Sequence, residues 1–182
     1  MKSIVAGHCG EVVWLSVAGA GSKENSADVV KFVEPEIAKG KRSFVVDLSD
    51  CTGLDSTFMG MLIGISKRLK QCVQGCLHII NARGRNAQLL RGLGVQHFCT
   101  VAEDAGPFCA EDGEQAGEVP ATFKSAPVVD CRELDRQLLS KGEQTAHCLK
   151  AHEDLCEISH ANQAKFKDVV ELMALKLRSL QP

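Results

Sequence analysis

The residues whose types and positions best suit a chemical role are Asp55 and Ser56, which lie between a short apolar run and a longer one. The short run, residues 44–48, is typical of a strand buried on both faces, and residues 59–69 carry apolar side chains at helical spacing. Asp and Ser are preferred N-cap residues, so we expect a helix to begin at this pair. The N-terminus of a helix favours an anion, so a phosphoryl group on Ser56 would be stabilised there.

A second set of reactive side chains lies near the C-terminus, where cysteine and histidine alternate at four-residue steps. On one continuous helix these side chains would share a face, and two neighbours could bind zinc. The whole row spans about three turns, roughly 18 Å at 1.5 Å per residue, so its residues cannot form a tetrahedron around one ion. We predict interface packing and no metal site, and the residues of the alternative, a metal or redox site, are Cys148, His152, Cys156 and His160.

The sequence gives little support for catalysis. His8, His78 and His97 lie at predicted turn or strand positions and belong to no motif that would pair them with Ser56. An acyl-transfer site needs a base, an orienting acid and an oxyanion site, and no Walker-type phosphate loop is present. We therefore expect no enzymatic activity and no cofactor.

The Asp-Ser pair lies within alternating strand and helix patterns. This alternation predicts an α/β domain with a mixed sheet and with helices packed mainly against one face. We expect a hairpin turn at residues 8–10 and a flexible break at residues 19–22. The expected strands are 2–6, 11–18, 44–48, 75–81 and 95–101, and the expected helices end near residues 39, 70 and 93.

The chain changes character after residue 103. Residues 104–126 place acidic side chains among Gly, Ala and Pro, which is typical of a flexible acidic linker. Residues 127–182 have a helical pattern, and residues 166–177 form an amphipathic stripe. Such helices are not stable alone, so this tail must pack on itself, on the domain of residues 1–103, or on a second copy as a homo-oligomer.

Composition limits the protein's partners and compartment. The net charge of −2 gives no support for nucleic acid as the main partner. No segment is long and apolar enough for membrane insertion, and the N-terminus lacks a secretory signal. The nine cysteines are odd in number and scattered, which is typical of reduced thiols. These features predict a soluble cytoplasmic protein.

The pattern V-x-D-L-S-x-x-x-x-L-D-S-T at residues 45–57 gives the chain a family resemblance. With the helix of small and aliphatic residues and the basic end at 67–70, it resembles the STAS domain, the fold of bacterial anti-sigma factor antagonists. The resemblance covers about residues 2–103. Gly60 fits the residues that usually follow the motif, whereas Phe58 and Met59 depart from them.

The resemblance implies a function as a signalling regulator. In that family the serine after the aspartate, here Ser56, is the phosphorylation switch. The unphosphorylated protein is expected to bind a serine kinase that doubles as an anti-sigma factor. Phosphorylation would add about −1.5 to −2 charge and break the complex, and a PP2C-type phosphatase would restore it. The expected partner-binding residues are Thr52, Gly53, Asp55, Ser56, Thr57 and Met61.

A second interpretation stays open. The Asp-Ser pair could be only a helix cap, and the protein a STAS-type scaffold or ligand-binding module without a phosphoswitch. Such a module could be a subunit of a membrane transport complex and could associate through its helical tail.

Overall fold

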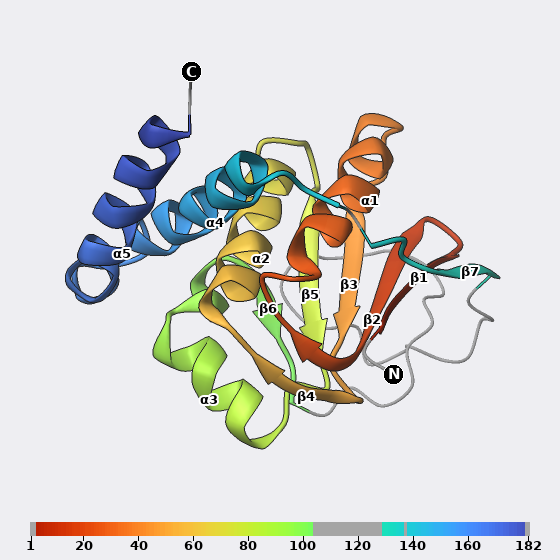
Figure 1. Ribbon diagram of the computed structural model, residues 1–182. Coiled ribbons are helices and arrows are strands. Elements are labelled where there is room, and N and C mark those ends of the chain that lie inside the picture. Colours follow the sequence, from red (N-terminus) through yellow and green to blue (C-terminus); the bar gives the residue numbers. More distant parts are fainter. Residues whose placement is uncertain (1–2, 104–128, 137, 181–182) are drawn as a thin grey trace.

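The computed structural model describes residues 3–103, 129–136 and 138–180, so the linker predicted at 104–126 lies outside the described residues. Within the described residues, seven strands form one mixed sheet (Figure 1). The strands are β1 (Ser3–Cys9), β2 (Val12–Gly21), β3 (Ser43–Asp47), β4 (Cys51–Leu54), β5 (Cys76–Ile80), β6 (Thr100–Val101) and β7 (Val129–Glu133).

The strand order is β6-β5-β3-β2-β1-β7, with β4 beside the end of β2. Strands β2, β3, β5 and β6 run parallel, because helical crossovers connect β2 to β3 and β3 to β5. The antiparallel neighbours are β1, which forms a hairpin with β2, and β7, which pairs with the outer side of β1. The mixed α/β sheet predicted from the sequence is confirmed.

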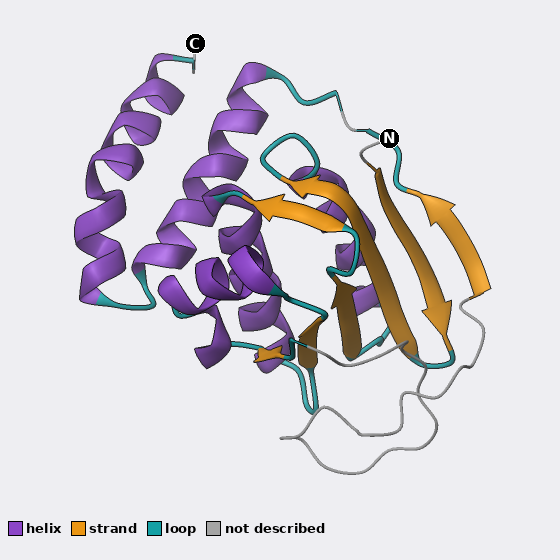
Figure 2. Ribbon diagram, turned by 90° about the horizontal axis from the view of Figure 1, so that it is seen from below, coloured by secondary structure: helices purple, strands orange, loops and turns teal. Residues whose placement is uncertain are grey.

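The helices cover the sheet mainly on one face (Figures 1 and 2). The main hydrophobic core lies between the sheet and helices α1 and α2, and a smaller cluster around Val12, Val45 and Ile80 lies on the opposite face. The described helices are α1 (Ser26–Ala38), α2 (Ser56–Lys70), α3 (Gly84–Gly92), α4 (Lys141–Cys156), α5 (His160–Ser179) and the short 3-10 helix η1 (Val95–His97).

Several local predictions were wrong. Residues 19–21, predicted as a flexible break, continue β2 and pair there with β4, a strand that the sequence analysis missed. Residues 95–97 form η1 where a strand was predicted, because Gly94 adopts a left-handed φ of 75° that redirects the chain. The predicted turn at residues 8–10 is shorter, since His8 and Cys9 still belong to β1.

The tail predicted as helical begins with a strand in its described part and is helical from α4 onward. Helix α4 lies across α2, and α5 lies on the outer side of α4 (Figures 1 and 2). Leu155 of α4 and Phe166 of α5 belong to the main core. The C-terminal helices therefore fold back onto the sheet domain. Among the described residues, no helix combines the length and apolarity needed to cross a bilayer.

We expect Leu62→Ala to lower the free energy of unfolding by about 2–5 kcal/mol, because this core side chain has no exposed surface. Leu138→Ala makes the same chemical change at a side chain that is 97% exposed, and it should change stability by less than about 0.5 kcal/mol. Denaturant unfolding of both variants measures the difference. Equal losses would contradict this placement of the core.

Candidate functional site

Asp55 caps helix α2, as the sequence predicted. Its backbone is extended, and its Oδ1 accepts a hydrogen bond of 2.8 Å from the backbone N–H of Phe58. Its Oδ2 accepts a second bond of 2.8 Å from the backbone N–H of Lys23, and its own N–H donates to the carbonyl of Gly21. The start of α2 is therefore fixed to the loop that follows β2, and Ser56 is the first residue of the helix.

Phe58 lies in the core and not on the surface beside Ser56. Its side chain is 1% exposed and packs against the end of β2 at Gly21. A Cβ atom at Gly21 would lie 2.8 Å from Leu54 and 3.0 Å from the ring of Phe58. Glycine is therefore needed here for close packing, and the surface near Ser56 is free of the bulky ring.

The hydroxyl of Ser56 hydrogen-bonds with His152 of α4. Ser56 Oγ lies 3.0 Å from His152 Nε2, and His152 Nδ1 lies 2.8 Å from the carbonyl oxygen of Cys148. The carbonyl can only accept, so Nδ1 carries a proton, and in the tautomer with its proton on Nδ1 the ring accepts at Nε2 from the Ser56 hydroxyl. The imidazole is 4% exposed and makes an edge contact with the ring of Phe166. Ser56 itself is half-buried.

Helices α2 and α4 cross at backbone contact. A Cβ atom at Gly60 would lie 2.1 Å from the carbonyl oxygen of Ala151, and one at Gly64 would lie 2.9 Å from a carboxylate oxygen of Asp154. Residues four apart share a face of a helix, so Ser56, Gly60 and Gly64 form one row of small residues. This row is the surface that receives α4.

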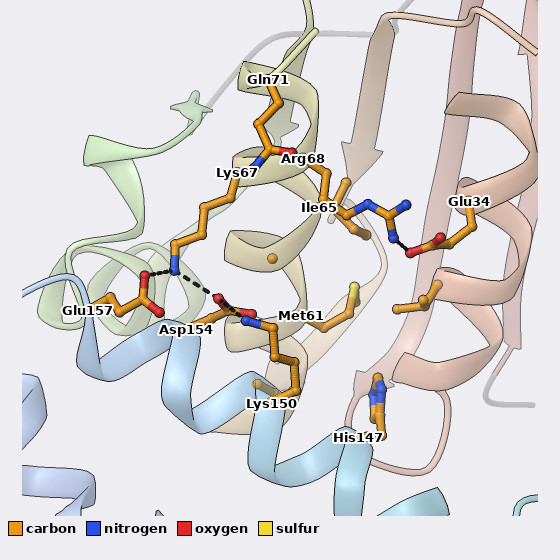
Figure 3. Close-up of a pocket in the computed structure, with 13 residues that line it drawn as sticks. Glu34, Met61, Ile65, Lys67, Arg68, Gln71, His147, Lys150, Asp154 and Glu157 are labelled. Atoms are coloured by element: carbon orange, nitrogen blue, oxygen red, sulfur yellow. Dashed lines mark hydrogen bonds and ion pairs between the residues drawn. The ribbon is translucent and has the colours of Figure 1, made fainter. Parts of the chain in front are cut away.

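Ion pairs hold the C-terminal half of α4 against α2. Lys67 Nζ lies 2.8 Å from Asp154 Oδ1 and also pairs with Glu157, and Lys150 binds the same Asp154 oxygen at 2.9 Å (Figure 3). Burial alone would lower the pKa of Lys67, but its bonds to the two carboxylates outweigh burial and raise the pKa. The Asp154 side chain is 3% exposed, so removal of Lys67 would leave a buried charge with less compensation.

Polar contacts hold the N-terminal half of α4. His147 Nε2 lies 2.7 Å from Ser26 Oγ at the start of α1. Burial lowers the pKa of His147, against the opposing effect of Asp28. Cys148 lies with its sulfur 4.0 Å from Thr57 Oγ1. Burial raises the pKa of the Cys148 thiol.

A cavity of about 460 Å³ opens between α1, α2 and α4. Figure 3 shows charged side chains around it, and these pair with one another: Arg68 with Glu34, and Lys67 and Lys150 with Asp154. No charged residue of this lining lacks a partner of opposite sign. The cavity therefore presents no uncompensated charge to a ligand, and Ser56 does not line it.

The six predicted partner-binding residues lie together on the β4–α2 segment, and they differ in exposure. Thr52 is exposed, and Gly53 and Asp55 are half-buried. Thr57 and Met61 are each 4% exposed. The chain therefore covers part of the surface that was predicted for a partner.

The cysteine and histidine row is divided between two helices. Cys148 and His152 face α2, Cys156 is half-buried at the end of α4, and His160 is exposed at the start of α5. In the part of the chain that the structure describes, no group of three metal-binding side chains comes together.

Sequence reasoning missed His152 as the partner of Ser56. Its only signal was the four-residue spacing, which marks a helix face but not what the face contacts.

The model of the STAS domain family matches residues 4–106, more than half of the chain. The chain belongs to the STAS domain family. Helices α4 and α5 lie beyond the matched residues. No curated protein is similar enough in sequence to match.

Solved structures of two proteins, TM1081 and SpoIIAA, resemble part of the chain. The NMR structure of TM1081 matches with a TM-score of 0.50 at 20% identity and covers 54% of this chain and 79% of that protein. The crystal structure of TM1081, a proposed anti-sigma factor antagonist from Thermotoga maritima, matches with a TM-score of 0.49 at 20% identity. This match covers 53% of this chain and 83% of that protein. The structure of the anti-sigma factor antagonist SpoIIAA in its unphosphorylated form matches with a TM-score of 0.48 at 17% identity. This match covers 57% of this chain and 90% of that protein. At these identities the similarity shows the fold alone.

We expect Gly60→Ala to displace α4 from α2. Alanine normally stabilises a helix interior, but here its Cβ would overlap the carbonyl of Ala151. Amide exchange in α4 and alkylation of Cys148 should both become faster, measured peptide by peptide with mass spectrometry. Gly92→Ala is the matched control, because a Cβ at this helical glycine has no neighbour within 4 Å. Unchanged exchange in Gly60→Ala would contradict the backbone contact.

We expect acid to weaken the docking of α4 through His147. Burial lowers the pKa of this imidazole below its ordinary 6.5, so the undocked ring takes up a proton first as the pH falls. At pH values well above 6.5 the ring is neutral whether α4 is docked or undocked, so it does not change the docking equilibrium. Exchange in α4, corrected for its intrinsic pH dependence, should therefore rise from about pH 7.5 to about pH 5.5. His147→Gln should reduce this rise, and His97→Gln, at an exposed position, should not. An equal rise in all three proteins would contradict the assignment.

Proposed function

We propose that this protein is a non-enzymatic signalling regulator of the anti-sigma factor antagonist type. It binds a serine kinase that doubles as an anti-sigma factor, and phosphorylation of Ser56 releases this partner. The observation that carries the proposal is the position of Ser56 as the first residue of α2, directly after its Asp55 cap, in a STAS domain. Partner binding and phosphorylation take place in the cytoplasm, where ATP is available to the kinase.

The chemistry of this position suits a charge-based switch. A phosphoryl group on Ser56 would lie at the positive end of the α2 dipole, which favours an anion. It would also add about −1.5 to −2 charge beside Asp55. A partner that fits the uncharged hydroxyl would meet two neighbouring anions after phosphorylation, and a PP2C-type phosphatase would restore binding. The proposed contact residues are Thr52, Gly53, Asp55, Ser56, Thr57 and Met61.

We favour binding over catalysis for the Ser56–His152 pair. A backbone carbonyl and not a carboxylate orients the imidazole, and the ring is 4% exposed. A hydrolytic serine needs space for a substrate beside its base, and the cavity between the helices is lined by neither residue. The pair is instead a contact between two helices.

The alternative function is a STAS-type scaffold, or a ligand-binding or transport-complex subunit, that has no phosphoswitch. The half-buried position of Ser56 beside α4 favours it, because α4 hinders the access of a kinase to this hydroxyl. Leu172 and Leu175 on α5 are 68% and 61% exposed and could contact a second copy. In this alternative the tail forms a homo-oligomer.

An affinity capture from the source cells separates the two functions. Full-length wild type and Ser56→Ala should retain a serine kinase, and Ser56→Asp should lose it by at least about tenfold, which corresponds to about 1.4 kcal/mol. Mass spectrometry should find phosphate on Ser56 of the wild-type bait. Ser140→Asp is the control, because it adds the same charge at the N-cap of α4, where Asp also caps well. If all baits retain the same proteins and Ser56 carries no phosphate, the phosphoswitch is contradicted and the scaffold function is favoured.

A further inference from the structure

Helix α4 occupies the surface that the proposed function requires. It contacts Ser56 through His152 and Thr57 through Cys148, and it lies outside the residues that match the STAS family. We propose that the small-residue face of α2, from Ser56 through Gly60 to Lys67, is a helix-binding site that α4 fills in cis. The partner binds by presenting a helix with the chemistry of α4 and displacing it. This inference rests on the proposed function, because it specifies how that partner reaches Ser56.

The shape of the site selects a helix with a small residue at the crossing point. At Gly60 the two backbones are so close that a single Cβ atom would lie 2.1 Å from the opposing carbonyl oxygen. Ala151, which is 3% exposed, is the α4 residue at that point. Since Ala151 is buried at this crossing, we expect a bulky side chain in its place to disturb the close approach of the two helices. We therefore infer that a partner helix carries a small residue there, such as Gly, Ala or Ser.

The polar groups of the site define the rest of the partner helix. The Ser56 hydroxyl needs an acceptor, which α4 supplies with His152, one residue after Ala151. Lys67 needs a carboxylate, which α4 supplies with Asp154, three residues after Ala151. The matching partner segment is thus a helix with a small residue, a hydrogen-bond acceptor next to it, and an acidic residue one turn further along.

The contact between α4 and α2 is of a kind that can exchange. It combines small and polar side chains at Cys148, Ala151, His152 and Asp154 with one large core side chain of α4, Leu155. Interfaces within a chain that have this character resemble transient protein–protein contacts. Strand β7 pairs with β1 independently of α4, so a released α4 stays attached close to its site. Its high effective concentration makes it a strong competitor of any partner helix.

Docking of α4 and phosphorylation of Ser56 exclude each other. In the phosphoryl transfer, Ser56 Oγ bonds to the γ-phosphorus of ATP, ADP leaves, and the hydroxyl proton passes to the base of the kinase. The modified oxygen can no longer donate to His152 Nε2, and the added phosphoryl group needs space that the buried imidazole of docked α4 occupies 3.0 Å from Oγ. The kinase therefore acts on the open form, and by linkage phosphate on Ser56 keeps α4 released.

The test uses the full chain and a fluorescent peptide of residues 140–158, under reducing conditions. Ala151→Arg in the protein removes the cis occupant and leaves the α2 face intact. Fluorescence anisotropy should show the wild-type peptide binding at least about tenfold more tightly to this variant than to wild type, since the competitor is gone. A peptide with the same Ala151→Arg change should bind neither protein. Ala164→Arg, on an exposed position of α5, is the matched protein control and should behave as wild type.

Two measurements keep the result decisive. Circular dichroism verifies the fold of Ala151→Arg, and alkylation of Cys148 by N-ethylmaleimide verifies the release of α4. Asp154→Lys is a second release variant, because it places a cation against Lys67 and Lys150. Equal peptide affinities for wild type and the released variants, or no binding to a folded and released variant, would overturn the helix-binding site. Failure of the proposed function alone gives a different result: the peptide would still bind the released variants, but no kinase would be retained and Ser56 would stay unmodified.

Discussion

The backbone contact between Gly60 of α2 and Ala151 of α4 is the constraint on which the site depends. It brings the axis of α4 so close to α2 that His152 reaches Ser56 at one end and Asp154 reaches Lys67 at the other. A single methyl group at Gly60 would remove this approach. The polar contacts are therefore consequences of the small-residue row, and they define the position of α4 along α2.

This contact links the reactive end of the STAS domain to its C-terminal helices. Asp55 caps α2 and holds it to the loop after β2, so the position of Ser56 is fixed whether or not α4 is docked. The state of the Ser56 hydroxyl then decides whether His152 has a hydrogen-bond donor. Under the proposed phosphorylation, a local chemical change at this one oxygen would alter the docking of α4 and α5.

Much of the domain could be predicted from the sequence because its signals are local. The β-branched run ending at Asp47, the Asp55 cap and the helical spacing of Met59, Leu62 and Ile63 specify β3, the turn and α2. The missed elements depend on distant partners. Strand β4 forms only because β2 extends beside it, and β7 has an exposed, polar pattern that becomes a strand by pairing with β1.

The sequence alone determined the STAS domain, the start of α2 at Ser56 and the presence of C-terminal helices, since caps, periodicity and the motif at residues 45–57 act over short distances. Only the tertiary structure decided what covers that serine. Ser56 and His152 are 96 positions apart in the chain, and helical spacing identifies a face without naming its neighbour. The pairing of the two helices follows from the matching of Gly60 with Ala151 and of Lys67 with Asp154, which requires both surfaces in three dimensions.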